Sequence, residues 1–182
     1  IASPGELPMD WNGTSGDGIT WKTAVPLPGF SSPIVWKNRI FLTGADQEAR
    51  EVYCFDSQEG KLLWTHKAKD IDGSPSEPPE VTEDTGHAAS TMTTDGVRVF
   101  AIFSTGDLVA LDMEGKRVWA KNLGKPEKPY GHSSSLVRFK DVLLIQYDQD
   151  EGSFVAGIDV ATGKEKWKVK RDFGPSWASP LL

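Results

Sequence analysis

Four residues in this sequence have the side chains expected of a ligand-binding site: Phe30, His87, His132 and Trp177. Each one opens a short segment of small residues, in "FSSPI", "HAAST", "HSSSL" and "WASPL". Phe and Trp offer flat apolar surfaces and the two histidines offer hydrogen bonds, a combination that suits a peptide or a sugar ring better than an ion. The pattern predicts a binding site, with the alternative that the rings only pack against neighbouring loops.

The sequence has no recognisable pattern of a catalytic or metal site. The two histidines lack a third ligand at the short spacing typical of zinc sites. The stretch "GHSSS" lacks the Gly-x-Ser-x-Gly turn of a serine hydrolase, and there is neither a P-loop nor a Gly-x-Gly-x-x-Gly motif. The single cysteine, Cys54, cannot form an intrachain disulfide. We therefore expect binding rather than catalysis, with no catalytic residue and no metal ligand.

The composition is that of an acidic globular protein. The chain has 182 residues, 38% of them hydrophobic, and a net charge of −6. This balance argues against a nucleic-acid partner, which requires a basic face. The longest apolar run, "VLLI" at 142–145, is too short to span a membrane. Because the chain starts at Ile1 without Met or a signal-like segment, we expect that it has been processed or trimmed, and a removed signal peptide is one reason.

A motif repeated three times supplies the framework for the candidate site. It occurs as "DSQEGKLLW" at 56–64, "DMEGKRVW" at 112–119 and "DVATGKEKW" at 159–167. Trp21 and the three motif tryptophans are 43, 55 and 48 residues apart, which is the length of a four-stranded unit. We expect the Asp to cap a turn, the Gly to adopt a positive φ and the Trp to pack between neighbouring sheets. The repeated residues are Asp56, Gly60, Trp64, Asp112, Gly115, Trp119, Asp159, Gly163 and Trp167.

Between the motifs the sequence predicts short strands rather than helices, in three groups of four. Several runs, such as "DLVALDM", are apolar on both alternating faces, which favours a sheet covered on both sides. Such units arrange around an axis as a β-propeller, so we predict an all-β fold of four-stranded antiparallel blades, about three to four in number, whose ring this chain does not close. The predicted strands are 31–37, 39–45, 51–57, 61–68, 90–96, 98–104, 107–113, 117–123, 134–140, 142–148, 153–159 and 165–171.

In a propeller the four candidate residues would begin the innermost strands and surround the mouth of the central channel on one face. The segment 68–86, "AKDIDGSPSEPPEVTEDTG", leads directly into His87. Its Pro, Ser and acidic residues predict an exposed loop between blades. This loop is either a tolerated insertion or a flap over the same mouth.

The motif at 159–167 resembles the tryptophan-docking repeat of the pyrroloquinoline-quinone (PQQ)-like β-propellers. The resemblance covers most of the chain, including "ITWKTAVPLPGFSSPIVWKNRIFLTG" and "GDLVALDMEGKRVW", although the first two motif copies lack the Thr. It implies a single propeller domain over residues 1–182, which we expect to be part of a seven- or eight-bladed propeller; the alternative is a dimer of half-rings. It also implies a periplasmic or secreted protein of the bacterial cell envelope.

Two functions are implied by this resemblance. One member of the family is an envelope lipoprotein that scaffolds outer-membrane β-barrel assembly without a cofactor, which implies a non-catalytic module that binds a protein or peptide, or a carbohydrate. The quinoprotein dehydrogenases of the family hold PQQ with a vicinal disulfide, a stacking Trp and Ca²⁺. Cys54 alone cannot form that disulfide, and no set of Glu, Asn and Asp stands at the inner strand ends. We therefore expect no cofactor, and keep as the alternative a dehydrogenase whose PQQ and calcium ligands lie outside this chain.

Overall fold

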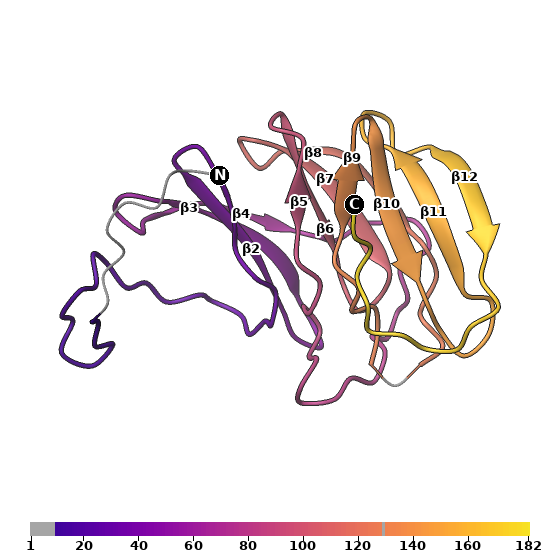
Figure 1. Cartoon of the computed structure of the whole chain (residues 1–182), viewed down its shortest axis with the longest axis horizontal. Coiled ribbons are helices and arrows are strands. Elements are labelled where there is room, and N and C mark those ends of the chain that lie inside the picture. Colours follow the sequence, from indigo (N-terminus) through magenta and orange to yellow (C-terminus); the bar gives the residue numbers. More distant parts are fainter. Residues whose placement is uncertain (1–9, 129) are drawn as a thin grey trace.

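The computed structural model describes residues 10–128 and 130–182 and contains three four-stranded sheets. Figure 1 shows the sheets side by side, fanned around a common axis. No helix is found in this described part of the chain, and therefore none that could cross a membrane. The predicted all-β fold, a partial propeller of about three blades, is confirmed.

Each sheet is an antiparallel meander in which the strands pair in sequence order, and we call the sheets blades 1, 2 and 3. Blade 1 contains β1 (Ile34–Trp36), β2 (Arg39–Ala45), β3 (Arg50–Asp56) and β4 (Leu62–Lys67). Blade 2 contains β5 (Thr93–Thr94), β6 (Arg98–Ile102), β7 (Asp107–Asp112) and β8 (Arg117–Asn122). Blade 3 contains β9 (Val137–Phe139), β10 (Val142–Tyr147), β11 (Phe154–Asp159) and β12 (Glu165–Lys170).

The repeated motif forms the turn between the third and fourth strands of each blade. In blade 2, Oδ1 of Asp112 accepts the backbone N–H groups of Glu114 and Lys116 at 3.1 and 2.8 Å, and Gly115 has a φ of 82°. Such a positive φ is readily adopted only by glycine. The equivalent Asp and Gly of blades 1 and 3 make the same kind of turn, which fixes where the outermost strand begins.

The motif tryptophans occupy the same register in all three blades. Trp64 lies opposite Cys54, Trp119 opposite Ala110 and Trp167 opposite Gly157, and a β-bulge follows each pair. A bulge increases the local twist and re-aims the side chains beside it. The three indoles therefore leave the outer strands at equivalent points.

The indoles of Trp21, Trp64 and Trp119 each contact the next blade along the chain. Nε1 of Trp64 donates to the carbonyl oxygen of Met113 at 2.9 Å, and a Cβ at Gly115 would lie 2.6 Å from the same indole. Trp119 makes the same pair of contacts with blade 3, and Trp21 makes them with blade 1. Trp167 stands on the last blade and is 40% exposed.

Two hydrophobic cores fill the two spaces between the blades. The first includes Phe41 and Cys54 of blade 1 and Val99 of blade 2, and the second includes Phe100 of blade 2 and Ile145 of blade 3. Successive residues of a strand point to opposite faces, so β6 and β7 supply both cores. This explains why each of these strands has four consecutive apolar residues, 99–102 and 108–111, rather than alternating ones.

The inner strands are shorter than predicted. The backbone N–H groups of residues at their predicted starts donate to side chains of the next blade or segment, and not to a strand of their own sheet. The predicted strands at 31–37, 90–96 and 134–140 are reduced to β1, β5 and β9. The backbone N–H of Ser32 donates to Oγ1 of Thr91, that of Thr91 to Oγ of Ser135, and that of Ser135 to Oγ of Ser179, at 2.9–3.1 Å. We call this series the hydroxyl ladder.

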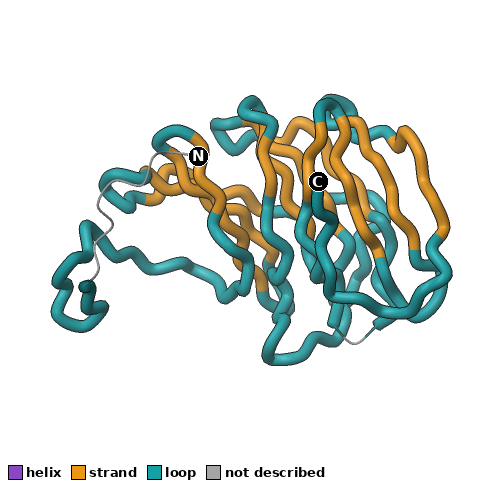
Figure 2. Tube along the Cα trace, in the orientation of Figure 1, coloured by secondary structure: helices purple, strands orange, loops and turns teal. Residues whose placement is uncertain are grey.

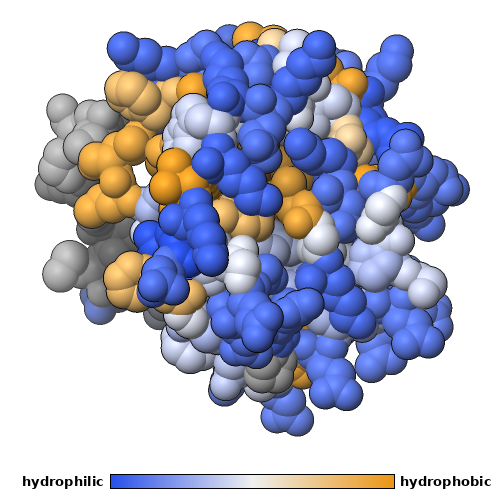
Figure 3. Space-filling model, turned by 90° about the vertical axis from the view of Figure 1, so that its right-hand side faces the viewer, coloured by the Kyte–Doolittle hydropathy of each residue, from blue (hydrophilic) through white to orange (hydrophobic). Residues whose placement is uncertain are grey.

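The loops that connect the blades gather at one end of the sheets, which is the lower end in Figure 2. The surface at the β12 side is largely hydrophilic, with hydrophobic side chains gathered toward one edge of it (Figure 3). All six residues of β12 are exposed. Two cavities lie at the end of the blades where the interblade loops gather.

Candidate functional site

Three of the predicted site residues, Phe30, His87 and His132, precede an inner strand, and the fourth, Trp177, follows the last strand of blade 3. We call the end of the blades at which the inner strands begin the mouth face. Phe30 is 58% exposed, and its N–H donates to the carbonyl oxygen of Ala88 at 2.9 Å. That bond places the start of blade 1 against the start of blade 2. Phe30 and His87 consequently line the same cavity.

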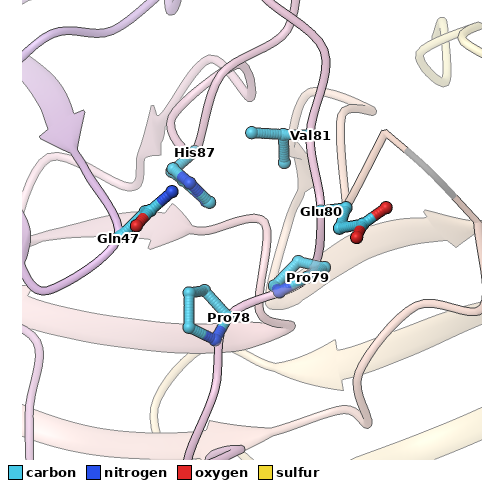
Figure 4. A pocket seen from close by; sticks show the side chains of 6 residues that line it. All are labelled: Gln47, Pro78, Pro79, Glu80, Val81 and His87. Atoms are coloured by element: carbon cyan, nitrogen blue, oxygen red, sulfur yellow. The ribbon is translucent and has the colours of Figure 1, made fainter.

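This cavity has a volume of about 230 Å³ and is bounded by Phe30, Asp46, Gln47 and His87, with small residues and a proline between them. An adjoining cavity of about 420 Å³ is lined by Gln47, His87 and residues 78–81. Gln47 and His87 belong to both cavities, so the two form one depression, which we call the mouth groove. In Figure 4, Gln47 and His87 lie beside each other, while Glu80 points away from them.

The His87 ring is held at one nitrogen. Its Nδ1 lies 3.1 Å from Oγ of the buried Ser104, and burial lowers the pKa of the ring although the charge of Asp46 acts in the opposite direction. The ring is therefore neutral at pH 7. A neutral imidazole bound at Nδ1 retains Nε2 as a hydrogen-bonding atom for a ligand.

Asp46 is a fixed negative charge at the base of the groove. Its Oδ1 accepts the backbone N–H groups of Ala49 and Glu48 at 2.7 and 2.8 Å, and these bonds hold the pKa of its carboxyl below the usual value. Asp46 occupies the tight turn between β2 and β3, and the N–H of Asp46 donates back to the carbonyl oxygen of Ala49. The sequence analysis missed Asp46 and Gln47; the polar run "DQE" that ends an apolar strand was the available signal.

The acidic loop at 68–86 forms one wall of the groove, and contacts with buried residues hold it in place. Ile71 and Pro79 are buried, and Oγ of Ser74 donates to Oδ2 of Asp107 at 2.8 Å. Asp107 is itself fully buried and also pairs with Nε of Arg50 at 3.1 Å. The loop thus has exposed acidic residues, as expected, on a backbone that is tied to both blade 1 and blade 2.

His132 lies next to His87 but faces the core. Ser104 connects the two residues, because its N–H donates to the carbonyl oxygen of His87 and its carbonyl oxygen accepts the N–H of His132, both at 3.1 Å. The His132 ring is only 2% exposed and stacks on Tyr147 at 4.9 Å, and its Nε2 donates to the carbonyl oxygen of Ser134. Burial lowers its pKa to about 3. His132 would therefore affect a ligand only through its neighbours.

Trp177 is 59% exposed and lies edge-on to Tyr130, with 5.2 Å between ring centroids. Phe30 precedes the first strand pair of its blade at Ile34 by four residues, whereas His87 precedes Thr93 by six and His132 precedes Val137 by five. The four residues are thus not equivalent positions. The structure brings Phe30 and His87 together in the groove, and Trp177 forms a separate aromatic surface with Tyr130.

The described residues do not fit the PQQ ligand set that the family resemblance implies for dehydrogenases. Cys54 is buried in the core between blades 1 and 2, where burial raises the pKa of its thiol to about 11. It has no adjacent cysteine with which to form a vicinal disulfide. No group of three or more His, Cys, Asp or Glu side chains in residues 10–128 and 130–182 is placed to hold a metal ion.

Four-stranded antiparallel meanders packed face to face define a partial β-propeller. The chain belongs to the family described as "Outer membrane protein assembly factor BamB", which matches residues 9–176. It is a PQQ-like propeller repeat protein, as its motifs predicted. No curated protein matches the sequence.

Solved structures with the same fold include BamB, quinohemoprotein alcohol dehydrogenases and a designed protein. BamB from Moraxella catarrhalis is 20% identical, with a TM-score of 0.57 over 85% of this chain and 43% of that one. The quinohemoprotein alcohol dehydrogenase ADHIIG from Pseudomonas putida HK5 is 19% identical, with a TM-score of 0.58 over 82% of this chain and 22% of that one. The computationally designed Ika4 protein is 14% identical, with a TM-score of 0.53 over 87% of this chain and 82% of that one. The chain therefore spans less than half of either natural neighbour, and the likeness establishes the fold.

Proposed function

We propose that this protein is a non-catalytic binding or scaffolding module of the bacterial cell envelope or secreted space, and that it binds a protein or peptide partner at the mouth face. The observation that carries the proposal is the mouth groove, in which the exposed Phe30 ring stands beside His87, Gln47 and Asp46. An exposed aromatic ring next to polar atoms that can hydrogen-bond is typical of sites that bind peptides.

Family membership supports the same proposal. The family is described as an outer membrane protein assembly factor, so a periplasmic location and a role in the assembly of envelope proteins follow for this chain as part of the proposal. The Trp177–Tyr130 surface extends the contact area that the groove alone would offer. A carbohydrate is a second ligand chemistry that the same aromatic and polar groups could hold.

Site-specific cross-linking in envelope extract tests this function. The photoreactive residue p-benzoylphenylalanine is placed at Phe30, at Trp177 or at Val97, which is exposed in the β5–β6 turn at the opposite end of blade 2. We expect one and the same envelope protein to be captured from the first two positions and not from the third. Equal capture from Val97 would contradict a binding site on the mouth face.

The alternative function is that of a PQQ-dependent dehydrogenase. It is favoured by the structural likeness to the quinohemoprotein alcohol dehydrogenase. In that case the groups that hold PQQ and calcium would be residues outside this chain, because the described residues do not fit them. Saturable PQQ binding by this chain alone would contradict the scaffold function.

A further inference from the structure

The loops at the mouth face are rich in acidic residues. Residues 68–86 include six acidic side chains and one basic one. The β2–β3 turn adds Asp46 and Glu48, and the β10–β11 turn adds Asp150 and Glu151. Alternate turns of a meander lie at the same end of a sheet, so these acidic residues lie at the same end of the blades as the groove, and Asp46 lines it. A cation is therefore attracted to this end of the blades over about 8–10 Å at physiological ionic strength.

The positive side chain that acts on His87 is itself paired with a buried carboxylate. Arg50 lies close enough to His87 to help lower the pKa of the ring. Its guanidinium is, however, held 3.1 Å from the buried carboxylate of Asp107 and is directed into the blade interface. Asp46 has no ion pair among the described residues, and its two backbone bonds both use Oδ1. The carboxylate thus keeps Oδ2 for another donor.

The groove has two compartments of different character that meet at Gln47 and His87. The smaller one combines the Phe30 ring with the Asp46 carboxylate, an aromatic face next to an anion. The larger one presents Pro78, Pro79 and Val81, an apolar wall. Gln47 and His87 stand between them with amide and imidazole groups that can bond a peptide backbone (Figure 4).

We propose that the smaller compartment takes a lysine or arginine side chain from an extended segment of the partner, with an apolar neighbour of that residue in the larger compartment. The alkyl stem of the side chain packs on Phe30, as long cationic side chains do on apolar surfaces, and the head group reaches Oδ2 of Asp46. The aromatic ring adds a cation–π attraction. This inference rests on the proposed peptide-binding function and assigns the chemistry that selects the partner.

Titration with two model peptides tests the inference. The probes are Ac-Ala-Leu-Lys-Leu-Ala-NH₂ and the same peptide with norleucine in place of lysine, which keeps the alkyl stem of the side chain and lacks the charged ammonium group. Chemical-shift changes of the backbone amides, followed by NMR, give the site and the Kd. We expect the lysine peptide to bind at least tenfold more tightly, with the largest shifts at residues 30, 46, 47 and 87.

The variant Asp46→Asn tests the charge alone, because the Asn side-chain oxygen can still accept the N–H groups of Glu48 and Ala49. The control is Asp150→Asn, which removes an exposed charge from the same face outside the groove. We expect Asp46→Asn to abolish the preference for lysine and Asp150→Asn to leave most of it.

Each other outcome overturns the inference. Equal affinity for the two peptides, a preference that survives in Asp46→Asn, or no binding of either peptide at millimolar concentration would show that the compartment does not select a cation. If cross-linking at Phe30 still captures an envelope protein, the binding function stands without this specificity. If that capture also fails, the function itself is wrong.

Discussion

All three histidines of this chain have a pKa below the ordinary value, and burial is the principal cause for each. His132 is the extreme case, since its ring is enclosed between Tyr147 and the backbone of Ser134. A side chain that must stay neutral in the folded state becomes a source of instability when the medium turns acidic. This matters for a protein proposed to work outside the cytoplasm.

The first prediction concerns acid stability. His132 has a pKa of about 3 in the folded protein and about 6.5 in the unfolded chain. Between these two values only the unfolded chain binds the proton, so the free energy of unfolding falls as the pH drops from about 6.5 toward 3. We expect the free energy of unfolding to fall between pH 7 and pH 5, and this fall to be about 1–2 kcal/mol smaller in His132→Phe, which keeps the stack on Tyr147. Urea denaturation at several pH values measures it. The same pH dependence of the unfolding free energy in the two proteins would contradict the low pKa of His132. The control is His87→Phe, at a partly exposed site, which should change this pH dependence less.

The second prediction concerns the turn glycines. Gly115 has a φ of 82°, and a Cβ there would also lie 2.6 Å from the Trp64 indole. Gly124 has a φ of 99° with no atom within 4 Å of the added Cβ. Gly124→Ala therefore meets only backbone strain of about 1 kcal/mol, whereas Gly115→Ala must also displace an indole. We expect Gly115→Ala to be the more destabilising by more than about 1 kcal/mol in urea denaturation, with a change in tryptophan fluorescence that the Gly124 variant lacks.

At the scale of the strand, the tryptophans of equivalent register differ in what lies beyond them. The indole N–H groups of Trp64 and Trp119 each donate to a carbonyl of the following blade. Trp167 sits on the last blade and contacts chiefly its own partner strand at Gly157. The same sequence motif thus contributes to the contact between blades in blades 1 and 2 but, among the described residues, not in blade 3.

The third prediction follows from this inequality. Trp119→Ala removes a ring packed between two blades and should cost about 3–5 kcal/mol of unfolding free energy. Trp167→Ala removes a ring that is 40% exposed and should cost less than half as much. Chemical denaturation of the two variants makes the comparison. Equal losses would mean that Trp167 is as fully packed as the other motif tryptophans.

The strands were largely predictable, because turn glycines and alternating apolar residues are local signals. The strand at 39–45 was predicted with the bounds of β2. The inner strands were predicted too long, since Ser32 and Thr91 read as strand residues although their N–H groups bond to hydroxyls of the next blade. No local pattern in a sequence reveals a bond between residues as far apart as these.

The alignment of inner-strand starts identified two residues, Phe30 and His87, that line one cavity in the structure. Whether this cavity binds a partner stays a prediction. The alignment missed the offsets of one and two residues between blades, and in an extended segment a shift of one residue turns a side chain to the other face. His132 accordingly points inward. Asp46 was missed although the polar run "DQE" marks the turn, because its place in the groove depends on residues of the neighbouring blade.

At the scale of the whole molecule, the fourth prediction concerns the binding of PQQ by this chain. Purified protein mixed with PQQ and Ca²⁺ should show no saturable change in absorbance and no oxidation of alcohols or sugars. The reason is that the described part of the chain has a single buried cysteine and no cluster of metal-binding side chains. Stoichiometric PQQ binding would favour the dehydrogenase and contradict the scaffold.

The two separate hydrophobic cores have a consequence for the order in which the protein opens. Blades 1 and 3 each contribute to one core, but β6 and β7 of blade 2 contribute to both. In an array held together by nearest-neighbour contacts, the terminal units open at the lowest free energy. Native-state hydrogen exchange should therefore find the slowest amides in β6 and β7 and the fastest among the strands in β12, whose side chains are all exposed. Uniform protection across the three blades would instead reveal a single cooperative unit, in which loss of any one blade releases the other two.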